Sequence, residues 1–475
     1  MAKPGPDVLR AAEAAKLRLR GRGAYGSSAA AQPPFASPSV VVPERATDTV
    51  VVKVRSTPRN VSRVARAMRV ADLASVRTEL PWLVKLVQDK VAERVTPVFS
   101  AAALDPAPRG VLAAMAEAAR PGPALRNARG LMTIKVAPGV NAMQLAAHLD
   151  QQKDEFEYAY VPAIKYPCVA RRAAKKGTRR RRAKGGEFSA RQWGHAAIRL
   201  AQAQARRGFR DASDVVVAVL DSGIDKTHPD LADMIDTYLN FLPHEDDRDY
   251  KGHGTHVSGI IAAETNNAVG IAGVCAARLM MLKALPKKGA RWNAEAYLKA
   301  LAHPIEAGVR ILNLSIGGGY DPGEKAVIQD LIEADIVVVA AMGNEYLEGN
   351  PTSYPAAYPG VIAVGASDEM DRRASFSCTG PHITLVAPGE RILSTTPTYP
   401  CELADYEDYD SWPGTSMATP HVAAAAALLL ARHPKLRATQ VREILARTAD
   451  NTPAQKKSFD NQFGNGRLNL AAALA

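Results

Sequence analysis

Six short apolar segments, separated by stretches of helical pattern, constrain the fold of this chain more than any other feature. They lie between residue 189 and the C-terminus, at 215–220, 279–285, 309–314, 336–340, 361–364 and 383–386. Helical patterns lie between several of them, at 255–263, 293–307 and 323–334. Strands without polar alternation are buried on both faces, as in parallel sheets. Residues 189–475 are therefore predicted to form an α/β domain with a parallel sheet and helices on both faces.

The N-terminal part has a different design. Residues 1–44 are rich in Ala, Gly, Pro and Arg without periodicity, and we expect a flexible arm. Two β-branched runs follow, at 49–55 and 131–136, and each is succeeded by a proline and a helical pattern. A last strand-like segment spans 156–164. Together these units predict a small α+β domain over residues 45–168.

A basic linker is predicted over residues 169–188. Nine of the fourteen residues in 171–184 are Lys or Arg, and none is a large apolar residue. Residues 1–190 hold 33 Lys and Arg against 15 Asp and Glu, whereas residues 191–475 hold 27 against 33. The two parts should therefore attract each other. A solvated linker, a nucleic-acid tail and a protease-sensitive joint all fit the basic run.

Composition excludes several classes of protein. With 47% apolar and 23% charged residues, the chain is typical of a soluble globular protein. The longest apolar run, 422–431, is about half the length of a bilayer-spanning helix. Residues 1–26 lack the apolar core of a secretory signal, so a cytoplasmic location is expected, with export by a non-classical route as the alternative. The cysteines are too few and too irregularly spaced for a disulfide framework or a zinc site, and are expected to be reduced: Cys168, Cys275, Cys378 and Cys401.

Three polar residues occupy positions suited to nucleophilic catalysis. Asp221 directly follows the strand predicted at 215–220, His253 opens a helical pattern, and Ser416 precedes an Ala/Leu-rich helix. An acid, an imidazole and a hydroxyl are the parts of an activated nucleophile. Their order along the chain, Asp, His and then Ser, is one of those known for triad hydrolases.

At these residues the sequence resembles the subtilisin-like serine proteases, the subtilases. The likeness covers nearly all of 191–475 and includes Asp-Ser-Gly at Asp221, His-Gly-Thr-His at His253 and Gly-Thr-Ser-Met-Ala at Ser416. It implies a serine endopeptidase that works through an Asp221–His253–Ser416 triad and an acyl-enzyme intermediate. Asn344 resembles the family's oxyanion asparagine and would act with the backbone N–H of Ser416.

The resemblance also implies substrate-binding residues. Ser315, Ile316 and Gly317 look like the strand edge that pairs with an extended substrate. Small residues would line the primary pocket: Gly317, Gly318, Ala341 and Gly343. Ser353 stands at the pocket base, where relatives often have glycine, so primary specificity stays open. His256, Asp225 and His421 are expected to be structural.

No cofactor is expected for the chemistry, but the family suggests structural calcium. Asp230 and Asn267 match side-chain ligands, and Val269 and Ile271 match carbonyl donors, an all-oxygen set that suits a hard cation. The loop at 264–271 is one residue longer than in relatives. A polar turn without metal is the alternative.

Two acidic loops precede catalytic residues, at 244–249 and 401–410. If both rim the cleft, they would attract basic residues near the scissile bond. Ordinary solvated loops are the alternative.

The N-terminal domain resembles the subtilase propeptide, an intramolecular chaperone and inhibitor removed by autocleavage. Its tail, 156–164, would lie across the cleft, and we expect a cut between Ala163 and Arg191. Protein or peptide substrates are the expected partners, with neither nucleic acid nor membrane. Two alternatives stay open: an uncleaved N-terminal region controlled by a regulatory protein, and a nucleic-acid-binding protein that uses the basic region.

Overall fold

A computed structural model describes residues 48–55, 86, 91–98, 125–170, 188, 191–288, 293–455 and 458–475. By its contacts the chain divides into two compact units, one of residues 1–104 and 128–162, the other of residues 105–127 and 163–475. The predicted arm, the helical pattern after Pro58 and the basic run 171–184 lie outside the described residues. The division assigns residues 163–168 to the second unit, whereas the sequence had suggested a domain extending to 168.

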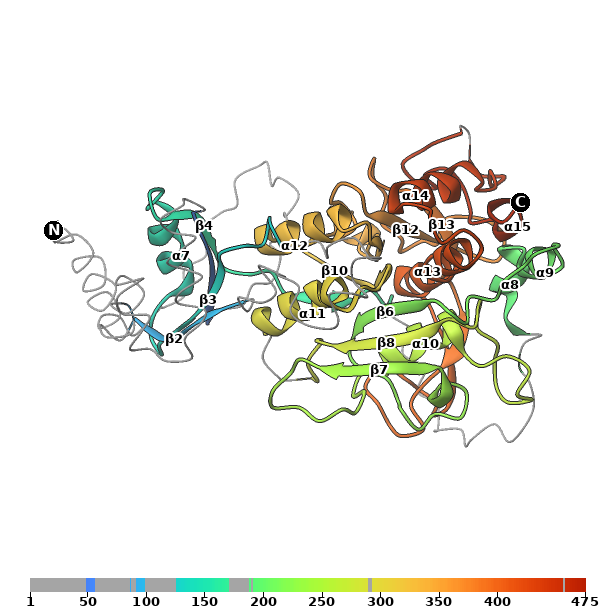
Figure 1. Ribbon diagram of the computed structural model, residues 1–475, viewed down its shortest axis with the longest axis horizontal. Helices are drawn as coiled ribbons and strands as arrows, with labels where there is room; N and C mark the ends of the chain where they lie inside the picture. Colours follow the sequence, from blue (N-terminus) through green and yellow to red (C-terminus); the bar gives the residue numbers. More distant parts are fainter. Residues whose placement is uncertain are drawn as a thin grey trace, which may run out of the picture. The chain divides into compact units, whose positions relative to one another are not determined.

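The first unit contains a four-stranded antiparallel sheet in the order β2-β3-β1-β4 (Figure 1). Its strands are β1 (Thr49–Val54), β2 (Ala92–Pro97), β3 (Leu131–Val136) and β4 (Phe156–Tyr160). Helix α7 (Ala142–Asp150) packs on β1 and β4, and the side chain of Asn141 caps its first turn by accepting the N–H of Gln144. Alternate valines of β1 enter the core, among them Val50 and Val52. In α7 the side chains of Leu145, Ala146 and Leu149 are buried, whereas Met143 is exposed.

The second unit is built on a seven-stranded parallel sheet in the order β13-β12-β11-β9-β6-β8-β7, and this confirms the predicted α/β class. Its strands are β6 (Val216–Asp221), β7 (Ile235–Asn240), β8 (Arg278–Lys283), β9 (Ile311–Leu314), β11 (Val337–Ala341), β12 (Ile362–Ser367) and β13 (Leu385–Pro388). The sequence missed β7, because this edge strand is only half-buried and has no apolar run.

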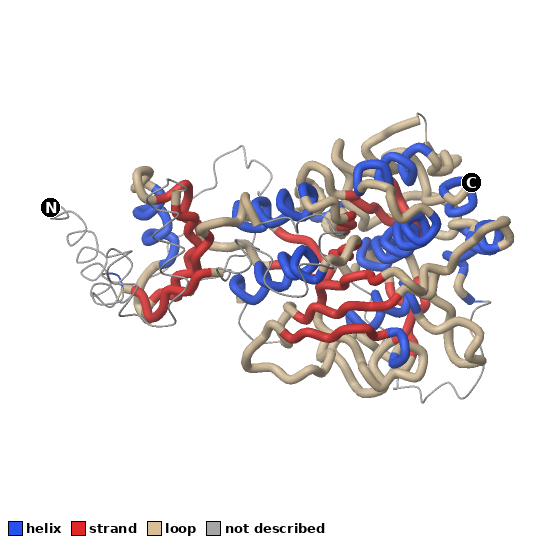
Figure 2. The backbone as a smooth tube through the Cα atoms, in the orientation of Figure 1, coloured by secondary structure: helices blue, strands red, loops and turns tan. Residues whose placement is uncertain are grey.

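Helices cover this sheet, as the tube in Figure 2 shows. They are α10 (His253–Ala262), α11 (Ala294–Ala307), α12 (Pro322–Glu333), α13 (Thr415–Arg432) and α14 (Ala438–Arg447), with the short α8 (Trp193–Ala197), α9 (Leu200–Gln204) and α15 (Leu470–Ala473). Helix α13 packs on five strands of the sheet and on α10, and its residues 415–431 are all buried. A run of alanines in α13, 423–427, adds little side-chain bulk between helix and sheet.

Two small antiparallel ribbons complete the second unit. One pairs β5 (Lys165–Pro167) with β10 (Ile316–Gly318), and the other pairs β14 (Ile392–Thr395) with β15 (Tyr409–Trp412). Within the described part of the chain, no helix is long and apolar enough to cross a bilayer.

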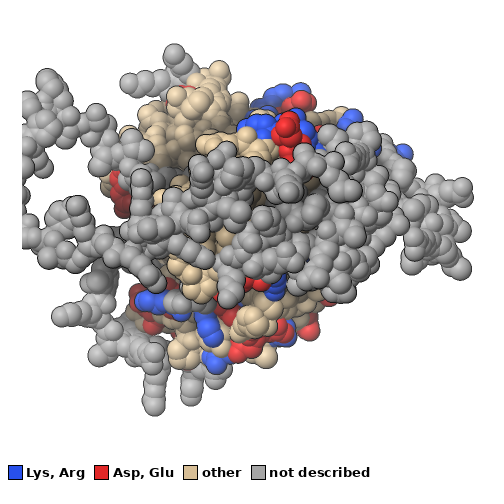
Figure 3. Space-filling view, turned by 90° about the vertical axis from the view of Figure 1, so that its left-hand side faces the viewer, with Lys and Arg blue, Asp and Glu red and all other residues tan. Residues whose placement is uncertain are grey.

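In Figure 3 the described basic and acidic side chains lie next to one another on the face shown.

The parallel topology brings polar residues to one edge of the sheet. Strand β6 ends at Asp221, Ser315 follows β9, and Asn344 follows β11. Carboxyl ends of parallel strands meet at the same edge, which is where such folds collect their functional groups.

Candidate active site

Asp221 and His253 form a buried, hydrogen-bonded pair. Asp221 is the last residue of β6 and His253 the first of α10, and neither has solvent exposure. The Nδ1 atom of His253 lies 2.7 Å from Oδ1 and 2.9 Å from Oδ2 of Asp221. A carboxylate there fixes the proton on Nδ1 and leaves Nε2 as the acceptor. Among the described residues Nε2 has no hydrogen-bond partner.

A second carboxylate, Asp249, organises the start of α10. It is fully buried and accepts hydrogen bonds from the Ser222 hydroxyl, the Gly252 N–H, and the N–H and hydroxyl of Thr255, over 2.7–2.9 Å. Burial raises the pKa of Asp249, while the Thr255 contacts act in the opposite direction. These bonds connect Ser222, which follows Asp221, with Gly252 and Thr255, which lie on either side of His253.

Ser416 is the second residue of α13, and its two donors point to different carbonyls. Its N–H donates to the carbonyl oxygen of Cys168 at 3.2 Å, and its hydroxyl donates to the carbonyl of Ser315 at 2.6 Å. The Ser315 hydroxyl in turn donates to the Ser416 carbonyl at 3.0 Å. The structure thus places the Ser416 hydroxyl on Ser315 rather than on His253.

Asn344 offers a free donor next to the N-terminus of α13. Its Oδ1 accepts the N–H and the hydroxyl of Thr415, each at 3.0 Å, and this orients the side-chain amide. Its Nδ2 is buried and has no partner in the described part of the chain. An unsatisfied buried donor is costly, so its retention points to an acceptor during function.

The segment after the first unit runs as an extended strand along the β10 edge. In the register of β5 and β10, Lys165 lies opposite Gly318, and Pro167 opposite Ile316. The Cys168 N–H continues the pairing by donating to the Ser315 carbonyl at 3.3 Å. Extended peptides bind proteases in this manner, through main-chain bonds that ignore side-chain identity.

The side chain of Cys168 is buried beside Gly317, one of the residues predicted to line the primary pocket. A Cβ built on Gly317 would lie 2.8 Å from the Cys168 sulfur and 2.5 Å from the Ser353 hydroxyl. A Cβ built on Gly343 would lie 2.8 Å from Oε2 of Glu345 and 3.2 Å from Cβ of Ser353. Burial raises the pKa of the Cys168 thiol. Space for the Cys168 side chain therefore depends on Gly317.

Gly318 and Ala341 were also predicted to line the primary pocket. A Cβ on Gly318 would lie 2.6 Å from the Ile164 carbonyl and 2.9 Å from Cδ of Lys165, so Gly318 faces the strand upstream of Cys168. Ala341 is buried at the end of β11.

Comparisons with known proteins agree with this architecture. The family model described as the subtilase family matches residues 212–466. The chain belongs to the subtilase family. Subtilisin E of Bacillus subtilis (strain 168) is 40% identical over 267 residues, which are 55% of this chain and 66% of that protein. Subtilisin of Bacillus pumilus is 40% identical over the same length, there 91% of the protein.

A solved structure is similar over most of this subtilase. The crystal structure of fervidolysin from Fervidobacterium pennivorans, a keratinolytic enzyme related to subtilisin, matches with a TM-score of 0.65 and 25% identity. The match covers 90% of this chain and 61% of that one. The family assignment and the subtilisin-like fold expected from the motifs are thus confirmed.

The residues suggested for calcium come together in this subtilase, but as a closed polar turn. Asp230 accepts the Asn267 amide at 2.8 Å, the Ile271 N–H at 2.9 Å and the Tyr409 hydroxyl at 3.1 Å. The Val269 N–H donates to Oδ1 of Asn267 at 2.9 Å. The side-chain oxygens needed for a cation are thus engaged by N–H and O–H donors, so the set does not fit calcium. No group of three or more His, Cys, Asp or Glu within the described ranges could hold a metal ion.

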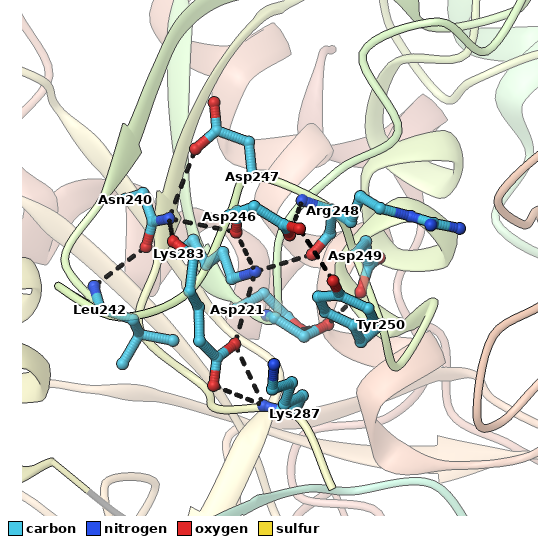
Figure 4. A network of polar contacts seen from close by, with 12 residues as sticks. Asp221, Asn240, Leu242, Asp246, Asp247, Arg248, Asp249, Tyr250, Lys283 and Lys287 are labelled. Carbon is cyan, nitrogen blue, oxygen red and sulfur yellow. Dashed lines mark hydrogen bonds and ion pairs between the residues drawn. The ribbon is translucent and has the colours of Figure 1, made fainter. Parts of the chain in front are cut away.

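The carboxylates of the first acidic loop are largely engaged within the subtilase itself (Figure 4). Asp247 pairs with Lys226 at 2.7 Å, Asp246 accepts the Tyr250 hydroxyl at 2.8 Å, and Glu245 lies 3.6 Å from the Lys283 ammonium. In the second loop Asp408 and Asp410 are buried. The electrostatic attraction expected from free carboxylates is reduced accordingly.

The structural expectation for three polar residues agrees with their contacts. His256 stacks on Trp412, with ring centroids 4.4 Å apart. Asp225 accepts bonds from Thr227 and Thr398. His421 is buried one turn after Ser416 and hydrogen-bonds the Met417 carbonyl at 2.8 Å.

Proposed function

We propose that this subtilase is a serine endopeptidase that acts through Asp221, His253 and Ser416, and that it first cuts its own Cys168–Val169 bond. The observation that carries the proposal is the hydrogen bond from the Ser416 N–H to the Cys168 carbonyl. A carbonyl held there, on a strand paired with Ser315, occupies the position of a substrate about to react.

The chemistry needs one rotation. The Ser416 side chain turns from the Ser315 carbonyl towards Nε2 of His253, which takes the hydroxyl proton as Oγ attacks the Cys168 carbonyl carbon. The Ser416 N–H and Nδ2 of Asn344 stabilise the resulting oxyanion. His253 then donates the proton to the nitrogen of Val169 as the peptide bond breaks, leaving Cys168 as an ester on Ser416. Water, deprotonated by His253, releases the acid.

In this proposal the N-terminal product is both inhibitor and folding template. After cleavage, the new C-terminal residue Cys168 keeps its bonds to Ser315 and Ser416. The N-terminal product therefore stays in the substrate-binding site and blocks it. Parallel sheets fold slowly because their contacts are distant in sequence, and a bound template would speed their formation.

A cytoplasmic location stays a prediction, which fractionation of cells would test.

The deciding experiment compares the purified full chain with its Ser416→Ala variant by intact-mass measurement and N-terminal sequencing. We expect the wild type to yield a product that begins at Val169, and the variant to stay whole. Loss of the nucleophile lowers turnover on peptides roughly 10⁶-fold in enzymes of this type.

Other results would favour other functions. A wild-type chain that stays whole and active would favour the uncleaved region controlled by a regulatory partner. A cut elsewhere between Ala163 and Arg191 would refute Cys168–Val169 as the site. Salt-sensitive nucleic-acid binding by residues 1–190, with no peptidase activity, would favour the third function.

A further inference from the structure

Lys165 places a charged side chain in the interior beside the β10 edge. Its side chain has no solvent exposure, and its ammonium has three acceptors. These are Oε2 of Glu324 at 2.7 Å, the Gly319 carbonyl at 2.9 Å and the Tyr354 carbonyl at 3.3 Å. A lysine ammonium has three donors, so the pocket matches its full hydrogen-bonding capacity.

Glu324 is the charged partner at the base of this pocket. It lies in the first turn of α12, is fully buried, and accepts the hydroxyl of Tyr297 at its other oxygen. Burial raises the pKa of Glu324, and Lys165 opposes this shift. Within the part of the chain that the structure describes, Lys165 is the only cation ion-paired with Glu324.

Lys165 has a defined position along the strand relative to the bond proposed to be cut. It lies three residues before Cys168, and the register of β5 and β10 sets it opposite Gly318. A Cβ on Gly318 would lie 2.9 Å from Cδ of Lys165, so glycine makes room for the lysine stem. In protease nomenclature Cys168 is P1 and Lys165 is P4. Tyr166, between them, is 42% exposed.

We infer that the pocket around Glu324 is the S4 subsite, which binds the P4 residue, and that it selects substrates with lysine at P4, the fourth residue before the cut. The inference rests on the proposed function. Glu324, Gly319 and Tyr354 all belong to the catalytic unit, so they remain when the N-terminal product leaves. Glu324 is then a buried carboxylate without its cation, a state that a substrate lysine relieves.

The physical chemistry favours lysine over other residues. A neutral side chain of equal length leaves Glu324 and two carbonyls without donors, which is costly in a buried site. Arginine brings a planar five-donor guanidinium that does not match three acceptors grouped around one point. The subsite is thus expected to bind arginine more weakly than lysine, and neutral side chains more weakly still.

The test uses enzyme purified after expression of the full chain, with quenched fluorescent peptides that reproduce residues 162–171. The P4 position carries lysine, arginine or norleucine, which keeps the four-carbon stem without the charge. We expect kcat/KM for the lysine peptide to exceed that of the norleucine peptide about 10- to 100-fold. It should also exceed that of the arginine peptide. A lysine peptide cleaved no faster than the norleucine or the arginine peptide would overturn the inference.

Glu324→Gln then tests the partner directly. It should reduce the lysine-to-norleucine ratio at least tenfold, whereas Glu333→Gln, an exposed carboxylate on the same helix, should leave the ratio unchanged. An unchanged ratio in Glu324→Gln would count against the subsite. If Glu324→Gln does not fold, the wild-type peptide series still decides. Failure of the proposed function is distinguishable, because the wild type would then cleave neither these peptides nor casein.

Discussion

Asn344 shows how one side chain can serve structure and chemistry with different atoms. Its Oδ1 accepts two bonds from Thr415, and its Nδ2 stays unbonded in the interior. The acceptor orients the amide and the donor is left for a developing oxyanion. The two roles can therefore be separated by substitution.

Asn344→Leu should lower kcat about 10²- to 10³-fold with little change in KM, because the lost bond forms in the transition state. Steady-state kinetics on one peptide measures both constants. Asn344→Asp is the matched control, since it keeps an acceptor for Thr415 and removes the donor. Near wild-type kcat in Asn344→Asp would show that the residue serves structure alone.

At the residue scale, the sequence was informative where a motif is local. Asp221, His253 and Ser416 each stand in a short signature at an element boundary, so their neighbours alone point to them. Lys165 and Glu324 were missed because they are 159 residues apart and meet only through the register of β5 and β10. Asp249 was read as part of a solvent-facing acidic loop, although its position just before the α10 helical pattern was a usable signal for a capping role.

At the element scale, α13 combines a reactive start with a wholly buried body. His421 lies in that body, and burial lowers its pKa to about 3, with the nearby His195 acting in the same direction. The unfolded chain carries a histidine of ordinary pKa, about 6.5. At a pH between these two pKa values, His421 is protonated in the unfolded chain and neutral in the folded chain.

The stability of the second unit should therefore fall as pH drops from about 6.5 towards 3, by about 1.4 kcal/mol per pH unit for His421. Above about pH 7 its contribution is constant. Urea unfolding of the Ser416→Ala chain at pH 7, 6 and 5, followed by fluorescence, measures the slope without self-digestion. His421→Asn can keep the bond to the Met417 carbonyl without titrating, and should show a smaller loss. Equal slopes in the two proteins would contradict the prediction.

Elements with continuous apolar character were predictable from their pattern, whereas the half-buried β7 was missed and the strand edge at 315–317 was expected only from the family resemblance. Strands β6, β8, β9, β11, β12 and β13 all arise within a few residues of the expected segments. Strands β5 and β10 have three residues each, and Gly317 and Gly318 carry no strand propensity. Their pairing is decided by the path of the chain in space, which one sequence does not encode locally.

At the scale of the whole molecule, one continuous chain carries a small antiparallel unit and a large parallel one. The catalytic sheet joins β6 with β9, and β9 with β11, so its neighbours are far apart in sequence. Such contacts form late, because long loops must close before any pairing stabilises them. Strand β5 offers β10 a partner from the segment that directly follows the first unit.

Deleting residues 1–168 should therefore lower the yield of active enzyme at least tenfold, and residues 1–168 supplied as a separate chain should restore part of it. The reason is kinetic, since the template lowers the barrier to forming the parallel sheet without changing the final fold. Active-site titration with a fluorophosphonate probe measures the yield. The same deletion in the Ser416→Ala background, followed by circular dichroism during refolding, separates slow folding from self-digestion. Refolding of the deleted chain as fast as the full chain would mean that residues 1–168 have no part in folding, and that their contribution is confined to occupying the β10 edge.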